Sequence, residues 1–106
     1  MALERVVHLL VVGSFEDLER LDEGGRMKAG EWRRRLDEFG KTLITPPRED
    51  LESADVIPVP GTNDAWSVWY RLWTKQEGKS DLSLQLTVRD SGAGKMRIEL
   101  DDLRVE

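Results

Sequence analysis

The spacing of the apolar residues changes once along this chain, around Pro46-Pro47, and that change limits the fold to one class. Before the two prolines, apolar residues recur every three or four positions, which is typical of helices with one buried face. From Val56 onward they alternate with polar residues, which is typical of strands that bury one side of a sheet. Helices first and strands afterwards predict an α+β domain whose helices pack on one face of the sheet.

The first part of the chain predicts three helices, at about residues 3–12, 15–21 and 29–39. Gly40 follows the third helix at the position where a left-handed cap belongs. The third helix carries an apolar stripe made of Trp32, Leu36 and Phe39. We therefore expect this stripe to pack on the apolar face of the sheet.

The second part predicts about four strands in a curved antiparallel sheet, the last three of them in a meander. The segment at residues 56–59 contains Pro58 and is followed by Pro60, so two missing N–H groups point the same way. This spacing fits only an edge strand with that side unpaired. In the last strand Leu103 and Val105 have the opposite parity to the apolar residues before them, and this predicts a β-bulge at Asp101-Asp102.

Composition excludes several classes of function. The length of 106 residues predicts a single domain, and the net charge of −5 argues against nucleic-acid binding. With no Cys and one His, we expect no catalytic residue, no metal and no cofactor. The apolar run at residues 6–12 is far shorter than the ~20 residues that cross a bilayer. These features predict a cytoplasmic protein with no membrane partner.

A set of motifs spreads over most of the chain: Glu31-Trp32-Arg33-Arg34 with Phe39-Gly40, Pro46-Pro47, Asp55-Val56-Ile57, Trp66-Ser67-Val68, Leu72-Trp73-Thr74 and Gly78-Lys79-Ser80-Asp81-Leu82. Together they resemble small bacterial proteins that form a domain of unknown function. The order of elements also looks like the cone-shaped nuclear transport factor 2-like and cystatin-like folds. This resemblance implies a fold and no catalytic residue. Some cone-fold proteins bind small apolar ligands or catalyse isomerisation, and others are immunity or partner-binding proteins.

The strand at residues 65–75 predicts the candidate site. Trp69, Arg71 and Trp73 alternate with inward residues, so we expect the three side chains to emerge together on the outer sheet face. Gln85 and Arg89 occupy outer positions of the next strand. Because Trp and Arg dominate interface energetics, the sequence predicts a non-enzymatic interaction domain. It would bind a protein partner or form a homodimer through this face, with an immunity-type role as one option.

The sequence leaves one alternative open, a small-ligand-binding or isomerase-like domain. Its pocket would lie between the helices and the inner sheet face, lined by Trp32, Phe39, Trp66 and Tyr70. A large cavity reached from solvent favours the ligand hypothesis. A filled core beneath an exposed aromatic sheet favours the interaction hypothesis.

Overall fold

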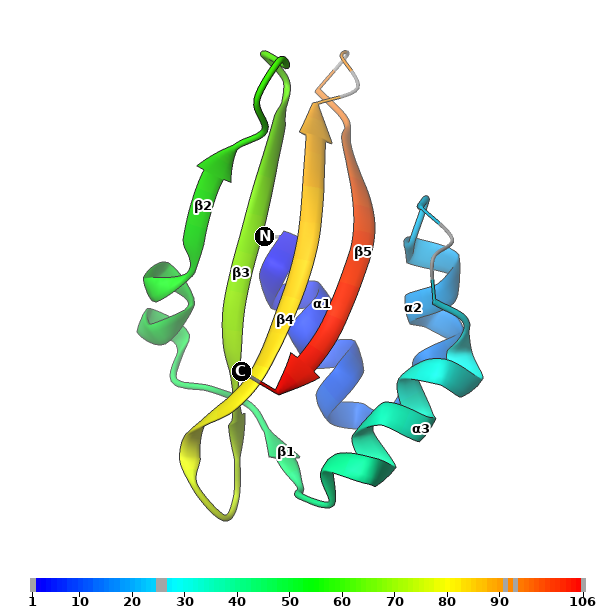
Figure 1. Cartoon of the computed structure of the whole chain (residues 1–106), viewed down its shortest axis with the longest axis vertical. Coiled ribbons are helices and arrows are strands. Elements are labelled where there is room, and N and C mark those ends of the chain that lie inside the picture. Colours follow the sequence, from blue (N-terminus) through cyan, green and yellow to red (C-terminus); the bar gives the residue numbers. More distant parts are fainter. Residues whose placement is uncertain (1, 25–26, 91, 93, 106) are drawn as a thin grey trace.

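The three predicted helices are present in the computed structural model, which describes residues 2–24, 27–90, 92 and 94–105 (Figure 1). They are α1 (Ala2–Val12), α2 (Phe15–Leu21) and α3 (Ala29–Phe39). Gly40 ends α3 in the left-handed conformation, with φ of 72°, and its N–H donates to the Leu36 carbonyl. The helical part of the prediction is therefore confirmed.

The strands form one antiparallel sheet. They are β1 (Leu43–Ile44), β2 (Asp55–Pro58), β3 (Ala65–Thr74), β4 (Gly78–Asp90) and β5 (Met96–Val105), with a 3-10 helix, η1 (Arg48–Ser53), between β1 and β2. The order is β1-β3-β4-β5, and β2 also pairs with β3. β1 and β2 therefore share one edge of β3, and η1 connects them (Figure 1). The α+β class and the meander are confirmed, whereas β1 and η1 were not predicted.

β2 is an edge strand, as its proline pattern predicts. Its ladder runs along β3, from Asp55 opposite Trp69 to Pro58 opposite Trp66. The N–H of Val59 donates to the Ala65 carbonyl at 3.0 Å. Because successive backbone groups point to opposite sides, the nitrogen of Pro58 faces away from β3. The outer edge of β2 therefore lacks a donor that a further strand would need.

β5 contains the predicted β-bulge. The register against β4 shifts between Gln85 and Leu86, which leaves Asp101 as the extra residue. The shift brings the apolar residues on both sides of it to one buried face: Ile98, Leu100 and Leu103. The two apolar residues at the strand ends are exposed, Met96 to 53% and Val105 to 59%.

A second irregularity, between β3 and β4, was not predicted. Arg71 faces Ser83, but Trp73 faces Lys79, so β4 uses more residues than β3 over the same stretch. The extra residues belong to β4, and in β3 the alternation of buried and more exposed positions continues to Thr74. The shift places Trp73 opposite Lys79.

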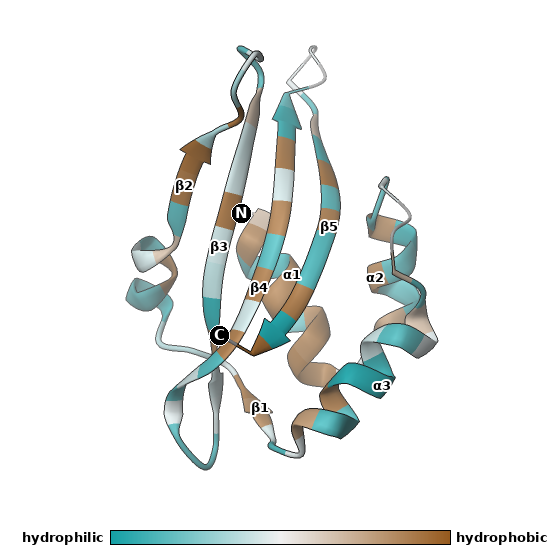
Figure 2. Cartoon of the chain, in the orientation of Figure 1, coloured by the Kyte–Doolittle hydropathy of each residue, from teal (hydrophilic) through white to brown (hydrophobic). Residues whose placement is uncertain are grey.

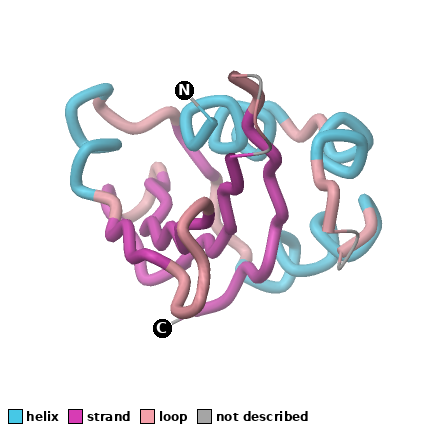
Figure 3. Tube along the Cα trace, turned by 90° about the horizontal axis from the view of Figure 1, so that it is seen from above, coloured by secondary structure: helices cyan, strands magenta, loops and turns pink. Residues whose placement is uncertain are grey.

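The helices lie on one side of the curved sheet and leave its other side open (Figure 3). Trp32 of α3 is 0% exposed and belongs to the same buried cluster as residues of three strands, among them Tyr70, Leu84, Leu86 and Leu100. Leu36 and Phe39 are only partly buried against this cluster. The predicted packing of the α3 stripe on the sheet is thus strongest at Trp32.

The segment after α2 and one side chain of α3 cover the free edge of β5. Glu23 N–H donates to the Ile98 carbonyl and Leu100 N–H donates to Asp22 Oδ1, both at 2.9 Å. Arg35 Nη1 donates to the Leu103 carbonyl at 2.9 Å. Addition of a strand is therefore obstructed at β5 as well as at β2.

None of the helices in the described residues is long and apolar enough to cross a membrane. A group of three or more side chains that could hold a metal ion is likewise absent from the residues that the structure describes.

Candidate interaction face

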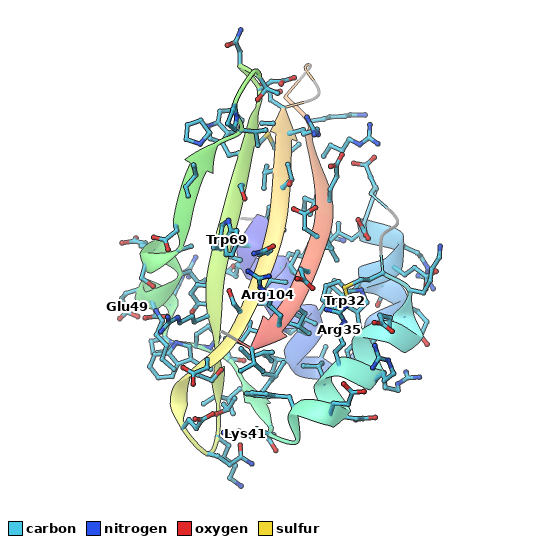
Figure 4. All side chains as sticks on the ribbon, in the orientation of Figure 1. Trp32, Arg35, Lys41, Glu49, Trp69 and Arg104 are labelled. Atoms are coloured by element: carbon cyan, nitrogen blue, oxygen red, sulfur yellow. The ribbon has the colours of Figure 1, made fainter. Side chains whose placement is uncertain are left out.

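Trp69 lies at the centre of the open side of the sheet. It faces Asp55 of β2 on one side and Gln85 of β4 on the other. The indole is half-buried, and its Nε1 donates to Ser67 Oγ at 2.9 Å. Arg104 lies over the ring, with Cζ 5.8 Å from the centroid, and Figure 4 shows the two side chains next to each other in front of the strands. These contacts hold the indole against the sheet with one part exposed.

Two exposed charges of opposite sign flank Trp69. Asp55 and Arg71 both line a pocket of about 430 Å³, together with Trp69. The other residues around this pocket are Ser53, Tyr70, Lys79 and Ser83. In the described part of the chain, neither the Asp55 carboxylate nor the Arg71 guanidinium has a hydrogen bond or an ion pair. We call Asp55, Ile57, Trp69 and Arg71 the Trp69 face, because all four occupy outer positions of paired strands.

The prediction that Trp73 emerges beside Trp69 is wrong. Its side chain is partly buried against the core, and its Nε1 donates to Asp50 Oδ2 at 2.8 Å. Trp73 keeps the outward parity of β3, but its indole N–H donates to Asp50 of η1, so the side chain lies against η1. Trp73 therefore helps to attach η1 to the sheet and does not belong to the Trp69 face.

Asp50 of η1 is the acceptor of a local hydrogen-bond cluster. Tyr70 Oη donates to Asp50 Oδ2 at 2.6 Å, and Lys79 Nζ lies 3.3 Å from the same oxygen. Burial by itself raises the pKa of Asp50, but the hydrogen bonds from Tyr70, Trp73 and Lys79 outweigh it and hold the pKa below its usual value. Burial, followed by the neighbouring Asp50 carboxylate, raises the pKa of Tyr70. The cluster therefore keeps a charged Asp50 beside a neutral Tyr70.

The two predicted site residues of β4 lie in different surroundings. Gln85 is half-buried directly opposite Trp69, as expected. Arg89 lies four residues further along, about 13 Å away at ~3.3 Å per residue, and its Nε donates to Glu99 Oε2 at 3.2 Å. Arg89 is therefore paired and is not a neighbour of Trp69.

The four aromatic residues of the alternative pocket do not come together. Trp32 is inside the closed core, Tyr70 is held by Asp50, and Phe39 lies near Leu82 and Leu103. Trp66 alone lines an open apolar pocket of about 430 Å³ beside the start of α1. The other residues of this pocket are Ala2, Leu3, Leu51, Glu52, Ala54, Val56, Val68, Leu86, Val88 and Met96.

Asp50, Asp55 and Arg104 were not recognised as site residues from the sequence. The edge-strand pattern of β2 could have placed Asp55, and the β-bulge could have placed Arg104, because both patterns fix which residues face outward. Asp50 has no such signal, since its partners are 20 to 29 residues away in the chain.

Comparison with known proteins gives a family without an assigned activity. Neither the curated proteins nor the solved structures contain a match to the chain. One family model, described as Domain of unknown function (DUF7668), matches residues 7–106. Because the match covers nearly the whole sequence, the chain is a member of the DUF7668 family.

Proposed function

We propose that this domain is a non-enzymatic protein-interaction module that binds its partner on the Trp69 face. One observation carries the proposal: an exposed guanidinium with no partner in the described residues stands beside a half-buried indole on the open side of the sheet. An indole supplies apolar contact area, and a guanidinium offers two parallel hydrogen bonds to a carboxylate. A protein surface that carries an acidic side chain fits this arrangement.

The closed strand edges also support binding on the face. The β2 edge lacks a donor at Pro58, and loop and side-chain contacts occupy the β5 edge. Elsewhere on the open side, Arg89 and Arg97 are already close to Glu99. The cone-type architecture and the immunity-type role that the sequence resemblance implies remain part of this proposal. Both are compatible with helices on the inner face and a partner on the outer face.

Arg71→Glu should strongly weaken partner binding. It should not unfold the domain, because Arg71 is exposed and its side chain makes no described polar contact. The measurement is affinity capture from an extract of the producing organism, with bound proteins quantified by mass spectrometry. We expect each specific partner, a second copy of the chain included, to fall at least ~10-fold, as for loss of a central interface charge.

Arg5→Glu is the matched control, because it makes the same change of charge on α1, which lies on the other side of the sheet. It should retain the partners. Equal capture by the wild type and Arg71→Glu would contradict the proposal.

A second candidate function rests on the apolar pocket at Trp66. Its volume of about 430 Å³ lies within the range of small-molecule sites, and apolar side chains form nearly all of its lining. Val56 and Met96 at this pocket are exposed to 57% and 53%. Figure 2 shows the corresponding apolar stretch on β2. A small apolar ligand would cover these surfaces.

This second candidate predicts saturable binding of the apolar dye 1-anilinonaphthalene-8-sulfonate, read by fluorescence. Met96→Asp should weaken binding at least ~10-fold, because it places a charge in the apolar lining. Val105→Asp is the control: it is equally exposed but lies at the other end of β5. Equal dye binding by the two variants would contradict a ligand site at Trp66.

A further inference from the structure

We infer that the partner of the Trp69 face is a second copy of this chain, related to the first by a twofold axis close to Trp69. The inference rests on the proposed function, because it assigns the occupant of the same face. Three observations support it: the face carries charges of both signs, it has exposed apolar area, and the strand edges are closed to sheet extension.

The charges of the face are self-complementary. Asp55 lies directly opposite Trp69 in the β2–β3 ladder, and Arg71 is two residues further along β3 on the same side. In a twofold dimer, if residue i of one copy meets residue j of the other, then j also meets i. An axis near Trp69 therefore brings Asp55 of each copy to Arg71 of the other and forms two equivalent ion pairs.

Several other charges on this side of the sheet are already engaged within the chain. Arg89 and Arg97 lie near Glu99, and Asp102 is paired with Arg35 of α3. Asp55 and Arg71 are thus the two charges around Trp69 that have no described partner within the chain. Asp55 and Arg71 balance each other, and the Arg104 guanidinium over the Trp69 ring adds a positive charge, so the face does not share the net charge of −5 of the whole chain.

Apolar area at the face has the right position for the centre of an interface. Ile57 is 54% exposed and lies beside Asp55 and Trp69 on outer positions of the sheet. Arg104 rests on the Trp69 ring, which holds the indole in place before association. A standard interface takes about 800 Å² from each copy, roughly one-eighth of the 6271 Å² surface of this chain.

The strand edges determine how the two copies meet. A partner strand cannot continue the ladder easily at β2 or β5, because Pro58 and the Asp22 and Arg35 contacts obstruct those edges. The two copies would therefore stack sheet on sheet, at the ~10 Å separation of packed sheets. At that separation Asp55 and Arg71 can bridge the interface.

Sedimentation equilibrium of the purified chain tests the inference. The wild type should form a dimer of about twice the 12.2 kDa chain mass, with a Kd at or below ~10 µM. Asp55→Arg gives a face with two positive charges, and Arg71→Asp gives one with two negative charges. Each variant alone should raise the Kd at least ~10-fold, because like charges then meet at both pairs.

Charge exchange makes the test specific. An equimolar mixture of Asp55→Arg and Arg71→Asp should form a heterodimer, since each positive pair then meets a negative pair. The double variant Asp55→Arg/Arg71→Asp should again form a homodimer. Arg5→Asp, which changes the charge on α1, should dimerise like the wild type. Unchanged circular dichroism of all variants shows that the domain remains folded.

Three outcomes would overturn the inference: a wild type that stays monomeric to ~1 mM, single variants that dimerise normally, or a mixture that fails to associate. A monomeric wild type whose Arg71→Glu variant still loses a captured partner would leave the proposed function intact. Failure of both experiments would reject the Trp69 face altogether.

Discussion

Trp32→Ala should lower the free energy of unfolding by about 3–5 kcal/mol, the range for removal of a fully buried aromatic side chain. Trp32 is 0% exposed and lies in the cluster that joins α3 to the sheet. Alanine leaves a cavity that the surrounding strands cannot close, because their apolar residues are held by the ladder. Urea titration followed by circular dichroism measures the loss.

Two further variants serve as controls for this effect. Phe39→Ala should lower the free energy of unfolding by less than about 3 kcal/mol, because Phe39 is only partly buried at the end of α3. Trp32→Phe should also cost less than Trp32→Ala. It keeps most of the ring volume and removes an indole N–H that has no hydrogen-bond partner among the described residues. If Trp32→Ala lowered the free energy of unfolding by less than about 1 kcal/mol, Trp32 would not be at the centre of the core.

The elements with a long periodic pattern were predictable from the sequence. The α3 stripe repeats over a full helix, and the leucines of β4 alternate over several residues. Each pattern therefore allows only one face of its element to be buried. The bulge at Asp101 was predictable for the same reason. Leu103 could reach the core only if one residue of β5 was left out of the ladder.

The elements defined by contacts distant in sequence were not predictable. β1 is two residues long, which is too short for any period, and it exists because Leu43 and Ile44 pair with the end of β3. η1 follows the two prolines and is fixed by Asp50, whose donors come from β3 and β4. These contacts depend on tertiary structure and leave no local pattern.

The candidate site was predicted only in part, because the parity of β3 fixes the face of a side chain and not the residues that contact it. In β4, opposite the end of β3, Ser80 Oγ donates to the Leu72 carbonyl at 2.7 Å and accepts the Leu82 N–H at 3.2 Å. This side chain thus takes part in backbone hydrogen bonding where the register shifts. A serine within an alternating strand gives no sign of this role. The parity of Trp69, Arg71 and Trp73 was predicted correctly, whereas the contact of Trp73 with η1 was not.

Asp50→Ala should lower the free energy of unfolding by about 2–4 kcal/mol at pH 7, because it removes the common acceptor of several donors. Tyr70 is 2% exposed, so its hydroxyl would lose its partner in a buried place. The Trp73 indole N–H would lose the same acceptor. Tyr70→Phe is the matched control: it removes a single hydrogen bond and should cost about 1 kcal/mol. Urea titration at pH 7 compares the three proteins.

The contribution of Asp50 should also depend on pH in a defined direction. Its pKa is lower in the folded chain than in the unfolded chain, so the unfolded state binds the proton more tightly. The stabilisation that the Asp50 carboxylate contributes is complete above its pKa in the unfolded chain, about 3.9. It is lost as the pH falls through its pKa in the folded chain. The Asp50→Asn variant has no ionisable group at this position. The difference in free energy of unfolding between the wild type and this variant should therefore be largest at neutral pH and shrink in acid. Urea titrations from about pH 7 to pH 2.5 measure this difference. The other carboxyl groups are present in both proteins, so their contribution to the pH dependence cancels in the difference. A deficit that stays constant over that range would mean that the charge of Asp50 does not stabilise η1 against the sheet, and that its hydrogen bonds act equally well when the group is neutral.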